Sequence, residues 1–178
     1  MRGEFNESHM PLAYLITFRC YGTWLHGDER GSVDRDHNVY GTPFLARHER
    51  REVEEQRRLK QAPVVLDNAR REVTEQAIRR VCQHRNWTLR AINVRTNHAH
   101  VVVSAACRPE KVLNDFKAYA TRGMREAGVW KSALRPWAEH GSRRYLWTER
   151  EVERACDYVL NHQGDDLVPH FDDEDDDD

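Results

Sequence analysis

The sequence predicts an α+β fold, in which a ferredoxin-like βαββαβ antiparallel sheet has helices on one face and is followed by a C-terminal tyrosine-bearing helix. Three observations predict it. Four segments rich in β-branched and aromatic residues indicate strands. Two longer segments with apolar residues at helical spacing lie between them, in the order of two βαβ units. The 178 residues are enough to bury one core in a single domain, and no internal repeat is evident.

The first strand is expected at residues 12–20 and the first helix at residues 64–85. The helix has apolar side chains at positions 66, 69, 73, 77 and 81, and Pro63 and Asp67 suit its start. Residues 21–61 form a long insertion between the two elements. A loop of that length inside a compact domain is usually functional or partly disordered.

Two strands are expected next, at residues 88–96 and 98–106, with Asn97 at the turn between them. Residues 110–127 predict the second helix, because Pro109 suits a helix start and an apolar stripe follows it, formed by Leu113, Phe116, Ala120 and Met124. A loop that contains Trp130, Pro136 and Trp137 leads to the last strand, at residues 143–147.

Thr148 and Glu151 have the spacing of a capping box, which predicts that the final helix starts there and ends at Gly164. Val152, Ala155, Cys156 and Val159 recur at helical spacing and would face the core. Tyr158 and His162 are one turn apart at the edge of that stripe. The helix therefore presents a phenol and an imidazole on one edge.

His98 and His100 are the most informative pair in the chain. Val101, Val102 and Val103 favour extended backbone, and residues i and i+2 of a strand point to the same face. The two imidazoles would stand side by side, roughly 6.5–7 Å apart at Cα, close enough to bind one divalent ion. The alternative is a pair of surface histidines on an amphipathic edge.

The run Asn97-His98-Ala99-His100-Val101, followed about sixty residues later by a helix with a tyrosine, resembles the HUH-type single-strand DNA transposases of insertion sequences, the IS200-like superfamily. The REP-associated tyrosine transposases are the branch it resembles most. The resemblance covers roughly residues 12–163 and implies the same ferredoxin-like fold. It also implies that Tyr158 is the nucleophile and that His98, His100 and His162 bind a divalent metal ion.

Relatives commonly have Gln or Asn at the third ligand position, so His162 is a variation and Gln163 is a rival for that role. The resemblance implies Mg²⁺ or Mn²⁺, whereas imidazole ligands alone favour Mn²⁺, Zn²⁺ or other ions that accept nitrogen. The metal would act as a Lewis acid on the scissile phosphate, and the product would be a 5′-phosphotyrosine with a free 3′-OH. The implied partner is single-stranded DNA that forms a hairpin, and relatives include both homodimers and monomers.

Three alternatives remain open from the sequence. Tyr119, in the second helix, could be the nucleophile instead of Tyr158. The chain could be a non-catalytic nucleic-acid-binding module with an RNA-recognition-like fold, although Asn97–Val103 offers histidines where stacking aromatic residues would be. It could also be a zinc hydrolase that uses the two histidines, but no His-Glu-x-x-His helix supports that.

The net charge of −2 hides a basic domain, because residues 172–178 are all acidic. Without those seven of the 30 acidic residues, 28 basic side chains face 23 acidic ones, a net charge of +5. A mildly basic surface suits a nucleic-acid binder. The basic candidates for DNA contacts are Arg143, Arg144, Lys117 and Arg122, and Trp24 or Trp130 could stack on bases.

The expected organisation is a leader at residues 1–11, the transposase domain at residues 12–170 and a disordered acidic tail at residues 171–178. A second methionine, Met10, is consistent with an artificial origin of the leader. The four cysteines lack Cys-x-x-Cys spacing and suggest core residues in a reducing compartment. No apolar run approaches a membrane span and no signal peptide is visible, so we expect a cytoplasmic protein that joins the nucleoid when bound to DNA.

Overall fold

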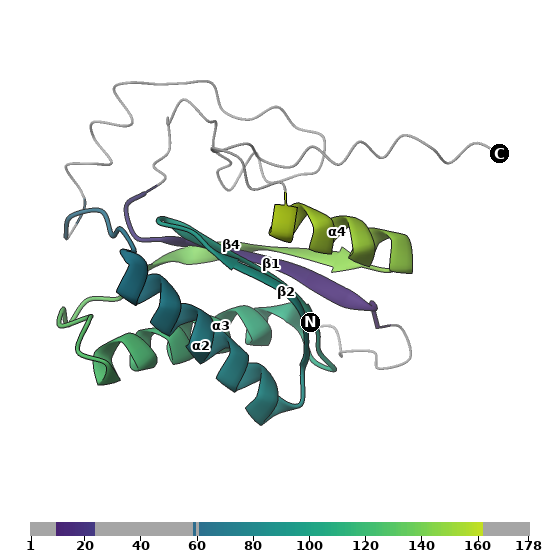
Figure 1. Ribbon diagram of the computed structural model, residues 1–178, viewed down its shortest axis with the longest axis horizontal. Coiled ribbons are helices and arrows are strands. Elements are labelled where there is room, and N and C mark those ends of the chain that lie inside the picture. The colour runs from purple at the N-terminus through teal and green to yellow at the C-terminus, as the bar shows by residue number, and fades with distance from the viewer. Residues whose placement is uncertain (1–9, 24–58, 60, 162–178) are drawn as a thin grey trace, which may run out of the picture.

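A computed structural model describes residues 10–23, 59 and 61–161 of the chain (Figure 1). The elements follow one another in the order βαββαβα. Their bounds are β1 Ala13–Cys20, α2 Asn68–Arg85, β2 Thr88–Val94, β3 His98–Ser104, α3 Pro109–Glu126, β4 Trp137–Leu146 and α4 Glu149–Asn161.

The four strands form one antiparallel sheet in the order β2-β3-β1-β4, so β1 and β3 are central. Helices α2 and α3 cover one face of the sheet and α4 lies on the other (Figure 1). This is the ferredoxin-like arrangement that the sequence predicts. The α+β fold class is therefore confirmed.

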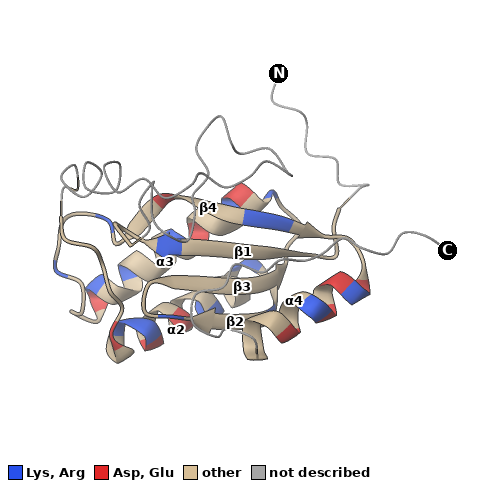
Figure 2. Cartoon of the chain, turned by 90° about the horizontal axis from the view of Figure 1, so that it is seen from above, with Lys and Arg blue, Asp and Glu red and all other residues tan. Residues whose placement is uncertain are grey.

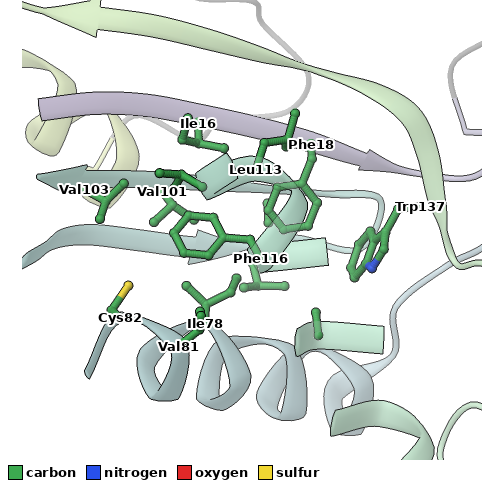
Figure 3. Packing of buried hydrophobic residues seen from close by; sticks show 14 of the residues in the cluster. Ile16, Phe18, Ile78, Val81, Cys82, Val101, Val103, Leu113, Phe116 and Trp137 are labelled. Atoms are coloured by element: carbon green, nitrogen blue, oxygen red, sulfur yellow. The ribbon is translucent and has the colours of Figure 1, made fainter. Parts of the chain in front are cut away.

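The larger core lies between the sheet and helices α2 and α3. Ile16 and Phe18 of β1 and Val101 and Val103 of β3 point to this side and are fully buried (Figure 3). The helices contribute Ile78, Val81, Leu113 and Phe116 to the same cluster. Side chains alternate along a strand, so the residues that alternate with these along β1 and β3 point to the face that carries α4.

A smaller core forms beneath α4. Ala13, Leu15, Ala91 and Val102 of the sheet pack with Val152, Ala155 and Val159 of the helix. The capping box is present as predicted, since the Glu151 N–H donates to Thr148 Oγ1 at 3.2 Å and the Thr148 N–H donates to Glu151 Oε2 at 2.9 Å. Helix α4 thus has a fixed start and a buried face.

Helix α2 begins four residues later than predicted. Val64 and Leu66 are buried, but their N–H groups donate to the carbonyls of Tyr21 and Thr96, which holds this segment extended. Asp67 is the N-cap, and its side chain accepts a hydrogen bond from the Arg70 N–H at 2.9 Å. The predicted helix was too long at its start, because the buried apolar residues of this loop continue the apolar spacing of the helix.

Strand β4 starts at Trp137, six residues before the predicted start. Trp137 is buried, and its ring meets Phe18 edge-on with 4.9 Å between ring centroids. The pairing with β1 is irregular between Phe18 and Cys20. There the Lys117 ammonium donates to the carbonyls of three residues at 2.9–3.0 Å: Ala138, Glu139 and His140. The predicted loop therefore belongs partly to the sheet.

Most of the leader, most of the 21–61 insertion and all of the acidic tail lie outside the described residues, as does the predicted helix end at Gly164. The four cysteines are free, with Cys20 and Cys82 buried and Cys107 and Cys156 half-buried. Within the described ranges, no helix has the length and apolarity that crossing a membrane requires.

Candidate active site

Strand β3 places the two histidines next to each other on the face that carries α4. Their ring centroids are 4.6 Å apart, and the ring planes are nearly perpendicular. His100 is buried, with 7% of its surface exposed, and His98 is half-buried. Ala99, between them, belongs to the opposite core, as the alternation predicts.

A protein oxygen contacts the Nδ1 atom of each histidine. His100 Nδ1 lies 2.7 Å from Thr17 Oγ1, and His98 Nδ1 lies 2.6 Å from Asn97 Oδ1. A carboxamide oxygen only accepts, so this contact favours the His98 tautomer with its proton on Nδ1. The Thr17 hydroxyl can accept from His100 in the same way. Metal-binding histidines commonly have this second partner, which leaves Nε2 as the ligating nitrogen.

Burial lowers the pKa of His100 to about 3, and the positive charges of His98, Arg19 and Arg95 add to the effect. The imidazole of His100 is therefore neutral at neutral pH. A neutral imidazole is the form that binds a metal ion. The donor chemistry of the pair thus fits a divalent cation.

Helix α4 brings Tyr158 next to the histidines on the same face of the sheet. The centroid of its ring lies 5.7 Å from that of His100, at an interplanar angle of 81°. Asn93 of β2, which pairs with His100 in the strand register, donates from Nδ2 to the Val159 carbonyl at 2.9 Å. This bond ties the backbone next to Tyr158 to the strand beside the histidines.

The third predicted metal ligand cannot be placed. His162 and its rival Gln163 lie outside the described residues. Among the residues that are described, no group of three or more His, Cys, Asp or Glu side chains could hold a metal ion. The structure therefore brings together His98, His100 and Tyr158 of the predicted catalytic set.

The predicted DNA-contact residues do not share one surface. Arg144 pairs with Leu15 and so points to the face with the histidines. Arg143 pairs with Ile16, points to the α3 side and forms an ion pair with Glu110 at 3.1 Å. Lys117 binds carbonyls of β4, and the Arg122 guanidinium lies 4.4 Å from the Tyr119 ring centroid. These last two side chains belong to α3, on the same side as Arg143.

The rival nucleophile Tyr119 packs against the core between the sheet and helices α2 and α3, so the sheet separates it from the histidines. The expectation that Trp130 stacks on bases is wrong. Trp130 is 8% exposed, its Nε1 donates to the Leu134 carbonyl, and the Arg70 guanidinium lies over its ring. Trp24 is outside the described residues.

Four polar residues near the histidines were missed by the sequence reasoning: Thr17, Arg19, Asn93 and Arg95. Thr17 and Arg19 lie opposite His100 and His98 in the pairing of β1 with β3. Asn93 lies opposite His100 on the other side. Strand alternation gives each residue a face, but only the register shows which residues meet across strands.

The model of a protein family described as "Transposase IS200 like" matches residues 58–154 of the chain, which is more than half of its 178 residues. The match contains the histidine pair and ends before Tyr158. Among solved structures, the chain is similar to a REP-associated tyrosine transposase bound to a REP hairpin. The identity is 12% and the TM-score 0.48, over 88% of this chain and 70% of that chain. No curated protein matches the chain.

Proposed function

Because the chain belongs to the IS200-like transposase family, a family of DNA-cleaving enzymes, we propose that it cuts and rejoins single-stranded DNA through a covalent bond to Tyr158. The observation that carries the proposal is the position of the phenol. Its ring lies 5.7 Å from that of His100, although 58 residues separate the two along the chain. A nucleophile beside a metal-binding pair is what phosphoryl transfer requires.

The Tyr158 oxygen attacks phosphorus and forms a 5′-phosphotyrosine, while the bond from phosphorus to the 3′ oxygen breaks. The phenol loses its proton, and the departing 3′ oxygen gains one and becomes a free hydroxyl. A free tyrosine has a pKa near 10, so a nearby cation that favours the phenolate makes attack faster at neutral pH. One phosphodiester replaces another, so attack by a 3′-OH can rejoin the strand without ATP.

His98 and His100 would hold a divalent ion, Mg²⁺ or Mn²⁺, through Nε2, and His162 or Gln163 would complete the ligand set. Such an ion would supply Lewis-acid chemistry at the scissile phosphate. Thr17 and Asn97 orient the two rings by accepting from Nδ1. Asn93 keeps α4 against β2, so that the phenol stays next to the histidines.

The substrate is single-stranded DNA with a hairpin, and the protein joins the nucleoid when it binds DNA. The packing of α4 on the sheet of its own chain supports a monomer in which one protomer supplies both the tyrosine and the histidines. A homodimer is compatible with the same site.

The test is to incubate the protein with Mn²⁺ and a pool of labelled hairpin DNAs with single-stranded flanks, and to look for a protein–DNA band that survives denaturation. The proposal predicts such a band and its loss in Tyr158→Phe and in His100→Ala. Tyr119→Phe is the matched control, because Tyr119 lies on the other side of the sheet, and it should retain the band. A band that persists in Tyr158→Phe and disappears in Tyr119→Phe would mean that Tyr119, and not Tyr158, is the nucleophile.

A binding module with an RNA-recognition-like fold would behave differently in the same assay. It would bind the DNA without metal and give no covalent band with any hairpin. The open face of its sheet would carry aromatic side chains for stacking. Here β3 has two histidines on that face instead.

A further inference from the structure

Two arginines flank the histidine pair on the face of the sheet that carries α4. Arg19 of β1 is the register partner of His98, so both side chains point to this face. Arg95 follows β2, and its N–H donates to the His98 carbonyl at 2.7 Å. Both arginine side chains are half-buried. Packing therefore restricts them more than it would restrict exposed arginines on a helix surface.

Strand pairing places the two arginines beside the histidines. Arg19 lies opposite His98 in the pairing of β1 with β3, and the Arg95 backbone is hydrogen-bonded to His98. Two guanidinium groups beside the pair carry positive charge, which attracts an anion.

Helix α4 covers the half of this face where β1 begins, through its packing on Ala13 and Leu15. The histidines and Arg19 belong to the other half, towards Cys20. In Figure 2, which looks onto this face, no described helix covers that half of the central strands. A strand of DNA whose phosphate lies at the histidines would extend past Arg19 and Arg95.

We propose that Arg19 and Arg95 bind the backbone phosphates of single-stranded DNA on the two sides of the phosphate held at His98 and His100. The inference rests on the proposed function, because it takes DNA as the substrate. A guanidinium presents paired donors that match two phosphate oxygens. Arg19 lies on the β1 side of His98 and Arg95 on the β2 side, so the phosphates that they bind lie on opposite sides of the site.

The experiment measures binding without chemistry. Fluorescence anisotropy with a labelled single-stranded oligodeoxynucleotide, in EDTA and over a series of KCl concentrations, gives the dissociation constant and its dependence on salt. Arg19→Ala and Arg95→Ala should each weaken binding about tenfold at low salt. Each should also reduce the slope of log K against log salt by about 0.7, the value for one phosphate of a single strand.

Arg79→Ala is the matched control. Arg79 lies on α2, on the other side of the sheet, and pairs with Glu75 at 2.7 Å. Its removal changes the net charge by the same amount but should leave affinity and slope within error. Arg19→Lys and Arg95→Lys retain the charge and should keep most of the slope while they lose part of the affinity. They also keep the test decisive if an alanine variant does not fold.

Failure of this inference can be separated from failure of the proposed function. If the wild type forms the Tyr158 adduct but both alanine variants bind DNA with unchanged affinity and slope, the arginines are not phosphate ligands and the inference is overturned. If no adduct forms but the variants lose affinity and slope, the inference stands and the catalytic proposal fails. Failure of the wild type to bind the oligonucleotide at low salt would overturn the inference as well.

Discussion

At the scale of single residues, the partners of the two histidines are as informative as the histidines. Thr17 Oγ1 and Asn97 Oδ1 each lie within hydrogen-bond distance of an Nδ1 atom. This arrangement fixes the ring orientation and leaves the proton on Nδ1 when Nε2 binds a metal ion. Thr17 comes from a different strand, so the site depends on the pairing of β1 with β3.

Thr17→Val tests this role, because valine keeps the shape of threonine and removes the acceptor. We expect Mn²⁺ affinity, measured by calorimetry, to fall about 10- to 100-fold. Thr17→Ser, which restores the hydroxyl, should recover most of the loss. Equal Mn²⁺ affinity in Thr17→Val and the wild type would show that the hydrogen bond does not orient His100.

The pKa of His100 also predicts how stability changes with pH. Its pKa is about 3 in the folded protein, against about 6.5 in the unfolded chain. Between these values the unfolded state binds more protons, so stability falls as the pH is lowered below about 6.5. At pH 5 the metal-free protein should lose about 2 kcal/mol through this residue.

Urea unfolding at pH 7 and pH 5 in EDTA measures that loss. His100→Gln has no titrating imidazole and should lose about 2 kcal/mol less than the wild type between the two pH values. A loss of the same size in both proteins would mean that other groups account for the acid sensitivity.

Some of the site could be predicted at this scale and some could not. The common face of His98 and His100 follows from strand alternation, and the structure agrees. The roles of Thr17, Arg19 and Arg95 depend on register, which no local pattern contains. Trp130 was misjudged because composition does not show that Arg70 and a backbone carbonyl enclose its ring.

At the scale of secondary-structure elements, α4 is positioned at two points. Its N-terminus is capped by Thr148 and Glu151, and its last turn is joined to β2 through Asn93 and the Val159 carbonyl. The capping box could be predicted from the sequence, because its two residues are only three positions apart. The Asn93 contact was not, since 66 residues separate the donor and the acceptor.

Asn93→Ala should loosen the end of α4 that carries Tyr158. We expect adduct formation to slow about 10- to 100-fold, because small misplacements of a reacting group have effects of that size. Affinity for single-stranded DNA should change little. Hydrogen exchange should increase in the last turn of α4.

Asn161→Ala is the control for that variant, since the Asn161 side chain donates to Asp157 on the exposed side of the same helix. It should leave the rate and the exchange unchanged. If Asn93→Ala reacts at the wild-type rate, the bond to Val159 does not position the tyrosine.

The element boundaries that differ from prediction have a common cause. Burial of Val64 and Leu66 imitates the start of a helix, although backbone hydrogen bonds to Tyr21 and Thr96 hold them extended. The predicted last strand was shorter than β4, because the first half of β4 contains Gly141 and several polar residues. An added Cβ at Gly141 would lie 2.7 Å from the Thr17 carbonyl oxygen, which explains the glycine but does not identify a strand.

At the scale of the whole molecule, the two faces of the sheet have different roles. Helices α2 and α3 enclose the larger core on one face, and the candidate active site lies on the other. The βαββαβ order and the antiparallel sheet could be predicted from periodicity. The sequence did not show that Lys117, Arg122 and Arg143 lie on the α3 side while Arg144 lies on the side of the histidines.

The distribution of charge along the chain gives a prediction at this scale. Residues 172–178 change the net charge from +5 to −2. If this acidic segment competes with DNA for the basic face, its deletion raises affinity for single-stranded DNA at low salt and has less effect at high salt, where screening is stronger. Anisotropy with the full and shortened chains measures this, and equal affinity at low salt would exclude competition by the tail.

The central claim is that Tyr158 becomes bonded to DNA. The most direct measurement is to isolate the covalent product, digest the DNA and the protein, and locate the remaining nucleotide by tandem mass spectrometry. We expect the nucleotide on the peptide that contains Tyr158, attached through its 5′ phosphate. A nucleotide on Tyr119 or on any other side chain would contradict the claim.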